Sequence, residues 1–278
     1  MDQTHLLAIS PLDGRYAAAA EPLRALFAEA GLIQERIRVE ALWLLELAQS
    51  VPQLAGAALG APVRARADAL ARDPGPAAAA AVKGIEARIN HDVKAVEYYV
   101  RQELAAAGAS PATLELVHFG CTSEDLNNLA YARLLRRARA QVLLPELGLI
   151  VGALRAFALQ HARLPMLSRT HGQSASPTTL GKEYANVVVR LQRALARLQA
   201  VRIFGKWNGA VGNFNAPAYA VPGIDWRALS ARFVSAQALE YNAFTTQIEP
   251  HDWLGEYADA CAAVRPKRRR SERARSDG

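Results

Sequence analysis

The sequence contains only two cysteines, Cys121 and Cys261, among its 278 residues. Two cysteines make no disulfide framework, and their positions match no common metal-ligand spacing. The N-terminal segment has no basic stretch followed by an apolar run, so no secretory signal is expected. No stretch approaches the roughly 20 uninterrupted apolar residues that a membrane helix needs. These absences predict a cytoplasmic protein with no membrane partner.

Aromatic residues are also scarce, at 7% of a chain that is 51% hydrophobic, with alanine and leucine prominent. This composition favours helices over sheets, and the length suffices for one large domain or two smaller ones. The fold class predicted is therefore all-α.

The net charge of +7 is concentrated at one end of the chain. Residues 265–278 hold seven basic and two acidic residues, which leaves a net charge of only +2 on the other 264. A nucleic-acid interaction through this tail would be strongly salt-dependent and would vanish with the tail. Because the body of the chain is nearly neutral, we expect a solvated, disordered tail and no nucleic-acid partner.

Apolar periodicity predicts helices separated by recognisable breaks. The segment 17–50 is expected to be helical, the break at 72–80 to separate two helices, and a further helix to run through 90–104, followed by a connector at 108–120 with one short helix. A long helix is expected from 123 to about 162, with Ser123 as N-cap and a kink at Pro145. Further helices are expected from Ser176-Pro177 onward, at 225–238 and at 250–264. "GKWNGAVGNFN" at 205–215 predicts a small β-hairpin. The expected domains are an N-terminal helical domain (1–111), part of a long-helix bundle (112–264) and the basic tail (265–278).

Five polar clusters stand at expected helix ends, often around a histidine. They read "SPLDGRY" (10–16), "INHDVKAVEYY" (89–99), "VHFGCTSEDLNN" (117–128), "SRTHGQ" (168–173) and "TTQIEPHDW" (245–253). Each is weak alone. In this order, together with "NGAVGNFNA", they resemble adenylosuccinate lyase of the fumarase and aspartase superfamily, from about Ile9 to Val264.

This resemblance implies a β-elimination that releases fumarate from adenylosuccinate and from the succinyl-carboxamide ribotide of purine biosynthesis. The departing nitrogen requires a general acid, and the dianionic intermediate requires oriented donors around its carboxylates. By resemblance, His171 is that acid, and Thr170 and Gln173 orient it and bind substrate. No metal or organic cofactor is required.

By the same resemblance, His91 supports catalysis, with Asn90 and Asp92 beside it in the pocket. Asp92 could hold His91 protonated; it could equally be an ordinary first-turn helix acid.

Four further kinds of contact follow from the resemblance. Thr122 and Ser123 match donors to the succinyl carboxylates, although a helix N-cap would also explain them. Gln247 matches a contact to the succinyl group, and Arg15 with Tyr16 matches a pair that contacts substrate and phosphate. His118 either lines the site or packs in the core, and a structural role is expected for Lys94 and His251.

The resemblance ends after "CAAV", close to Val264. The family's signature loop, S-S-x-M-P-x-K-x-N-P, carries the serine base and occurs nowhere in the 278 residues. The resemblance therefore predicts a truncated lyase with little activity alone. Relatives build their sites from three subunits of a homotetramer, so a full-length partner could supply the loop. The alternative is an inactive fragment that acts only as a helical association partner.

Overall fold

The computed structural model describes residues 7–51, 53–54 and 59–264. The described residues form two compact units, one within Met1–Ala138 and Ile203–Pro250 and the other within Arg139–Arg202 and His251–Gly278. Regular structure in the described residues is almost entirely helical, which confirms the all-α fold class. The expected domain boundary at residue 111 falls inside the first unit, and that division stays a prediction. The basic tail, 265–278, lies outside the described residues.

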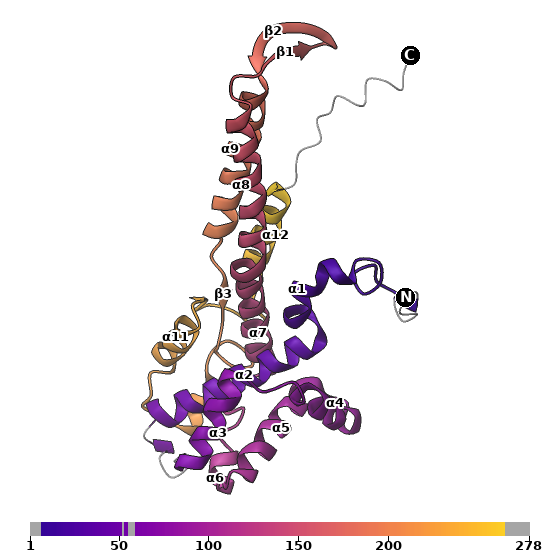
Figure 1. The fold of residues 1–278 in the computed structure, drawn as a ribbon. Coiled ribbons are helices and arrows are strands. Elements are labelled where there is room, and N and C mark those ends of the chain that lie inside the picture. The colour runs from indigo at the N-terminus through magenta and orange to yellow at the C-terminus, as the bar shows by residue number, and fades with distance from the viewer. Residues whose placement is uncertain (1–6, 52, 55–58, 265–278) are drawn as a thin grey trace. The chain divides into compact units, whose positions relative to one another are not determined.

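The first unit is a helical domain with one very short sheet (Figure 1). Its elements are α1 (Ala17–Phe27), α2 (Glu29–Ser50), α3 (Ala61–Arg72), α4 (Ala78–Ile89), α5 (Asp92–Ala106), α6 (Pro111–Leu114), α7 (Ser123–Ala138), β3 (Phe204–Gly205), α10 (Asn215–Ala220), α11 (Trp226–Ala236) and β4 (Glu240–Tyr241).

Helix α2 is the centre of this unit. It packs against α1, α3, α4, α5 and α7, and its residues Ile37, Leu44 and Leu47 are fully buried. A helix that buries residues around its whole circumference is a core helix. On one side, Trp43 packs against Trp207 and Phe233, with ring centroids 5.0 Å away in both cases. The segment 203–250 is thereby joined to the N-terminal helices by aromatic contacts.

The second unit contains two long paired helices and a β-hairpin (Figure 1). Its elements are η3, a π-helical turn (Arg139–Leu143), α8 (Leu144–Gln160), β1 (Pro165–Thr170), β2 (Gln173–Thr179), α9 (Leu180–Ala200) and α12 (Asp252–Val264). Helix α9 packs on α8 and on α12. A Cβ at Gly181 would lie 2.3 Å from the carbonyl oxygen of Ala158, so glycine permits the close approach of α8 and α9.

Most expected helices are confirmed, including the separate helices on either side of 72–80, the short turn α6, and helices α11 and α12. The first expected helix, 17–50, is divided at Ala28, whose extended backbone separates α1 from α2. Helix α7 begins at Ser123 itself, so the N-cap position falls on Thr122 rather than Ser123. The kink expected at Pro145 stays a prediction. The helical stretch Ser123–Gln160 is continuous there, and the π-helical turn η3 lies just before Pro145.

The predicted helix start at Ser176-Pro177 is wrong, because these residues belong to strand β2. Helix α9 begins at Leu180, and Thr179 is its N-cap, with Oγ1 accepting a hydrogen bond from the N–H of Lys182 at 3.2 Å. Pro177 lies opposite Leu167 in a two-stranded sheet. A proline is tolerated there because both strands are edges.

The small hairpin is β1–β2, whereas the segment at 205–215 has a different structure. There, Phe204–Gly205 pairs in parallel with Glu240–Tyr241, and residues 206–214 form a glycine-rich loop. Gly212 has φ +78°, and a Cβ on it would lie 2.2 Å from the Thr245 carbonyl oxygen. The glycines thus serve a close approach between two loops rather than a hairpin turn.

The helical stretch Ser123–Gln160 is long and apolar enough to cross a membrane, by length and composition alone. Its apolar part carries Glu146 and Arg155, each unfavourable in lipid by about 2.5–3.5 kcal/mol at the centre of a spanning helix. One such helix is weak evidence for a membrane protein. Exposed side chains such as Leu149, Ile150 and Leu159 equally suit cover by other helices.

Candidate active site

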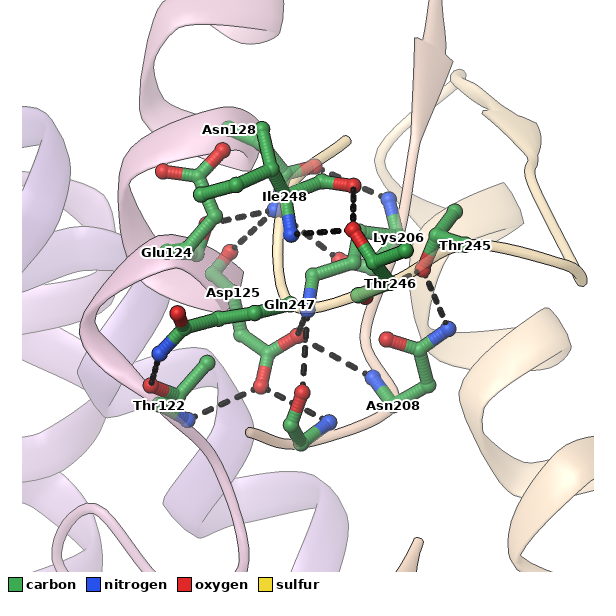
Figure 2. A network of polar contacts seen from close by, with 11 residues as sticks. Thr122, Glu124, Asp125, Asn128, Lys206, Asn208, Thr245, Thr246, Gln247 and Ile248 are labelled. Carbon is green, nitrogen blue, oxygen red and sulfur yellow. Dashed lines mark hydrogen bonds and ion pairs between the residues drawn. The ribbon is translucent and has the colours of Figure 1, made fainter. Parts of the chain in front are cut away.

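Asp125 organises the part of the candidate site that lies in the first unit (Figure 2). Its carboxylate accepts hydrogen bonds from the backbone N–H groups of Thr122, Asn208 and Gly209, at 2.9, 3.1 and 3.0 Å. The ammonium group of Lys206 lies 2.9 Å from Oδ1, and both side chains are fully buried. The contact with Thr122 is the backward half of a capping box at the start of α7. One carboxylate therefore fixes two loops that carry site motifs.

Asn128 and Asn208 extend this network. The amide of Asn128 donates to the carbonyl of Lys206 and accepts from its N–H, at 3.1 and 2.8 Å. The amide of Asn208 donates to Thr245 Oγ1 at 2.8 Å, which connects the loop at 206–209 to the segment before Gln247. Side chains far apart in the sequence thus hold three loops in register (Figure 2).

Two of the expected carboxylate-binding side chains are brought together by this network. Gln247 Nε2 donates to Thr122 Oγ1 over a long 3.4 Å, and Gln247 is exposed at the surface of the unit (Figure 2). Ser123, the first residue of α7, follows Thr122 directly. A helix N-terminus flanked by a hydroxyl and an amide presents several donors to an anion.

His91 and its neighbours line a separate cavity of about 520 Å³ in the same unit. Asn90 ends α4 in the left-handed conformation (φ +53°), and His91 is the N-cap of α5. Arg36 and Tyr131 also line this cavity. Arg36 is mostly buried, and its guanidinium lies 2.9 Å from Asp92 Oδ2. The cavity therefore combines an imidazole, an amide and an ion pair at one rim.

That Asp92 holds His91 protonated stays a prediction. His91 Nδ1 lies 3.8 Å from Asp92 Oδ1 and 3.1 Å from the backbone nitrogen of Lys94, which donates to it. Asp92 also pairs with Arg36. Partial burial, the largest single influence, opposes ionisation, but the Val93 N–H and the Arg36 guanidinium together hold the pKa of Asp92 below its usual value. Asp92 also occupies the first turn of α5, as its alternative role predicted.

His118 is paired with a buried carboxylate. Its Nδ1 lies 3.0 Å from Oε2 of Glu40, a buried residue of α2. Burial lowers the pKa of His118 and is the largest influence, yet the charge and hydrogen bond of Glu40 outweigh it, so the pKa is raised. No sequence pattern indicates this pairing, because Glu40 lies 78 positions away in a helix with no site motif.

The remaining expected residues of the first unit have simpler surroundings. Arg15 and Tyr16 are exposed, and the Arg15 guanidinium lies 5.7 Å from the Tyr16 ring centroid. Lys94 binds both oxygens of Glu97, at 2.8 and 2.7 Å, in keeping with a structural role. His251, at the boundary of the second unit, packs its ring against Trp253.

His171 lies in the second unit, at the tip of the β1–β2 hairpin. His171 and Gly172 form its two-residue turn, with φ +51° and +73°, the pattern of a type I′ turn. Thr170 and Gln173 are the strand residues that flank the turn, and all three polar side chains are exposed. The imidazole is therefore carried on a projecting element and accessible to a ligand. Its proximity to Thr122, Gln247 or His91 stays a prediction.

Asp125 and Lys206 were missed as organising residues. The sequence patterns gave neither residue a role in the site. Their partners lie more than 80 positions apart in the chain, beyond the reach of any local pattern. A buried charge is recognisable only once the fold is known.

Comparison with known sequences shows strong similarity to one kind of enzyme. The chain is 45% identical over 260 residues to the adenylosuccinate lyase of Haemophilus influenzae and 43% identical over 267 residues to that of Escherichia coli K12. Each alignment covers 94% of this chain. The chain spans 57% and 58% of the length of these two relatives.

Comparison with solved structures supports the fold. Similar structures include a 3-carboxy-cis,cis-muconate lactonizing enzyme from Pseudomonas putida (TM-score 0.65, 22% identity) and a fumarate lyase from Mesorhizobium sp. BNC1 (TM-score 0.67, 19% identity). Each covers 88% of this chain, which in turn covers 53% and 54% of them. A family model described as a lyase matches residues 14–267. The chain belongs to this lyase family.

Proposed function

We propose that the chain is a C–N lyase polypeptide of the adenylosuccinate lyase type, which takes part in the elimination of fumarate from a succinyl-purine nucleotide. The observation that carries this proposal is the Asp125 network, which holds Thr122, Ser123 and Gln247 beside the start of α7. Such donors suit the two carboxylates of a succinyl group. The sequence similarity to adenylosuccinate lyases, over 94% of the chain, supports the same chemistry.

Each candidate residue has a proposed role in the elimination. His171 protonates the departing nitrogen as the C–N bond breaks, with Thr170 and Gln173 orienting substrate at the hairpin tip. His91 lines the pocket beside Asn90 and Asp92 and assists catalysis. A group outside these 278 residues removes the carbon-bound proton, since the serine-bearing signature loop does not occur among them.

Arg15 and Tyr16 are proposed to bind the phosphate. Their exposure leaves a cation and a hydroxyl available to an anionic group. No step in this scheme requires a metal or an organic cofactor. We also propose a cytoplasmic location, because a chain with two free thiols suits a reducing compartment.

Assembly is part of the proposal. Several large apolar side chains of α8 and α9 are exposed, including Leu149, Ile150, Leu159 and Val189. Association with further copies or with full-length relatives, in a tetramer by analogy with the family, would bury them. The same observation favours the second candidate function, a helical association partner without activity of its own.

The experiment that separates these functions is a complementation assay. Adenylosuccinate cleavage is followed by absorbance for the chain alone and for the chain mixed with Escherichia coli adenylosuccinate lyase whose histidine aligned with His171 is changed to alanine. Under the lyase proposal, the mixture recovers turnover that neither component shows alone, and His171→Ala in this chain removes it. Stable mixed oligomers without recovered turnover would favour the association partner.

A further inference from the structure

Three side chains of the first unit place metal-binding atoms close together outside the elimination scheme. A carboxylate oxygen of Glu40, a ring nitrogen of His118 and the sulfur of Cys121 all lie within 4.8 Å of one another. Glu40 belongs to α2, and the other two belong to the connection between α6 and α7. Because Glu40 is distant in sequence, no ligand spacing reveals this cluster.

One carboxylate oxygen of the cluster is buried without a hydrogen-bond partner among the described residues. The Glu40 side chain is fully buried, and its Oε2 contacts His118, but its Oε1 has no hydrogen-bond partner among the described residues. A buried carboxylate oxygen without a partner is unfavourable and calls for a physical reason. The contact with His118 provides a partner for Oε2 only. A cation held between the carboxylate and the thiol would provide a partner for Oε1.

The cluster is also held by its surroundings. The indole N–H of Trp43, one turn along α2 from Glu40, donates to the Phe119 carbonyl at 2.8 Å and fixes the connection against the helix. His118 has a left-handed backbone (φ +65°), which is uncommon for a residue other than glycine. Ligands on a fixed connection and a buried helix face lose little freedom when they bind an ion.

We propose that Glu40, His118 and Cys121 bind one thiophilic divalent cation of the Zn²⁺ class, with water as a fourth ligand. Thiolate, imidazole and carboxylate together suit Zn²⁺ and disfavour Mg²⁺ and Ca²⁺, which prefer oxygen ligands. On binding, the thiol proton and the proton shared by His118 and Glu40 pass to solvent. The resulting carboxylate and thiolate balance the two charges of the ion. The site shares no residue with the Asp125 network, although Cys121 directly precedes Thr122.

Co²⁺ titration of the chelator-treated full chain tests this site without reference to activity. Co²⁺ reports thiolate ligation through a near-ultraviolet charge-transfer band and tetrahedral geometry through intense visible bands. The expected result is saturation at one ion per chain with both features, displacement by Zn²⁺ and no displacement by excess Mg²⁺. Absence of the charge-transfer band from the folded wild-type chain overturns the proposal.

Matched variants assign the ligands. Cys121→Ser should remove the charge-transfer band, whereas Cys261→Ser, at the only other cysteine of the chain, should retain it. Glu40→Gln and His118→Ala should weaken Co²⁺ binding by at least about tenfold, since even losing an outer partner of a metal ligand has an effect of that size. Circular dichroism verifies the fold of each variant. A band that disappears with Cys261→Ser and persists in Cys121→Ser contradicts the assignment.

Discussion

Lys206 Nζ lies 2.9 Å from Asp125 Oδ1, and neither side chain is exposed to solvent. This ion pair joins α7 to the loop after β3, and three backbone N–H groups also bind the Asp125 carboxylate. Lys206 in turn donates to the Gly209 carbonyl at 3.1 Å. A buried pair with so many additional hydrogen bonds acts as a fixed connection between loops, and removing one partner leaves the other charge uncompensated.

Lys206→Met should therefore lower the free energy of unfolding by about 3–5 kcal/mol, the usual cost of breaking a buried pair. Urea denaturation measures this change. Lys83→Met is the matched control: Lys83 pairs with Glu29 and Glu86 at the surface, and such solvent-screened pairs contribute little to stability. Equal effects of the two variants would contradict the role assigned to Lys206.

Gly212→Ala should displace the loop that precedes Gln247. Gly212 has φ +78°, and an added Cβ would meet the Thr245 carbonyl oxygen at 2.2 Å. Gly223→Ala provides the control, because Gly223 also has positive φ (+87°) but a methyl group added there would meet no atom of the described residues within 4 Å, apart from its two chain neighbours. Backbone strain alone costs roughly 1–2 kcal/mol at either site. The excess loss of unfolding free energy in Gly212→Ala, measured by urea denaturation, reports the clash.

If both glycine variants lose the same stability, the two loops do not approach as closely as described. In complementation assays, we further expect Gly212→Ala to raise the apparent KM, since Thr245 and Gln247 belong to the displaced segment. Gly223→Ala should leave the KM unchanged.

Thr179→Ala should destabilise the second unit by about 0.5–2 kcal/mol, because Thr179 Oγ1 caps α9 by accepting from the Lys182 N–H. Ser176→Ala should change stability by less than about 0.5 kcal/mol, because Ser176 lies in exposed strand β2. Thermal unfolding of the two variants measures the difference. The opposite ranking would mean that α9 begins at Ser176, as the sequence alone indicated.

That contrast shows where sequence reasoning reaches its limit. Ser176-Pro177 satisfies the pattern of a helix start, yet the same residues also suit an edge strand. Ser176-Pro177 form a strand rather than a helix because they pair with strand β1, Pro165–Thr170. Apolar periodicity along the sequence does not reveal this pairing. By contrast, α2, α5 and α11 carry strong helical periodicity and were predicted because their buried faces follow from local spacing.

The candidate site divides in the same way. Thr122 and Gln247 belong to recognisable motifs, and the network that joins them was not predicted. Its organiser, Asp125, resembles an ordinary first-turn acid until Asn208 and Gly209 are brought against it. His91 and His118 were both noticed, with Asp92 named as a possible carboxylate partner of His91 and no partner named for His118. Asp92 is adjacent to His91 and pairs with Arg36, whereas His118 pairs with the distant Glu40.

Asp92→Asn should reduce the sensitivity of the fold to acid. Because the pKa of Asp92 is below its usual value of 3.8 in the folded state, its ionised form contributes stability above pH 3.8. This contribution is lost as the pH falls through the lower folded-state value. The side chain is half-exposed, so solvent screening keeps the effect small. Unfolding free energies of wild type and Asp92→Asn should therefore converge in acid and diverge towards neutrality; parallel curves would refute the pairing with Arg36.

His171→Asn separates the chemistry of the hairpin tip from its conformation. Asparagine tolerates the left-handed backbone that His171 adopts at φ +51°, so the variant should retain the type I′ turn and the stability of the hairpin. It removes the imidazole, and loss of a general acid typically lowers the rate by about 10²–10⁴-fold. Mixed with the acid-deficient Escherichia coli relative, His171→Asn should form oligomers as wild type does, yet fail to restore adenylosuccinate cleavage. Restored turnover would exclude His171 as the proton donor. In that case the exposed imidazole at the tip would need another role, such as substrate binding, because the backbone geometry alone does not require a histidine there.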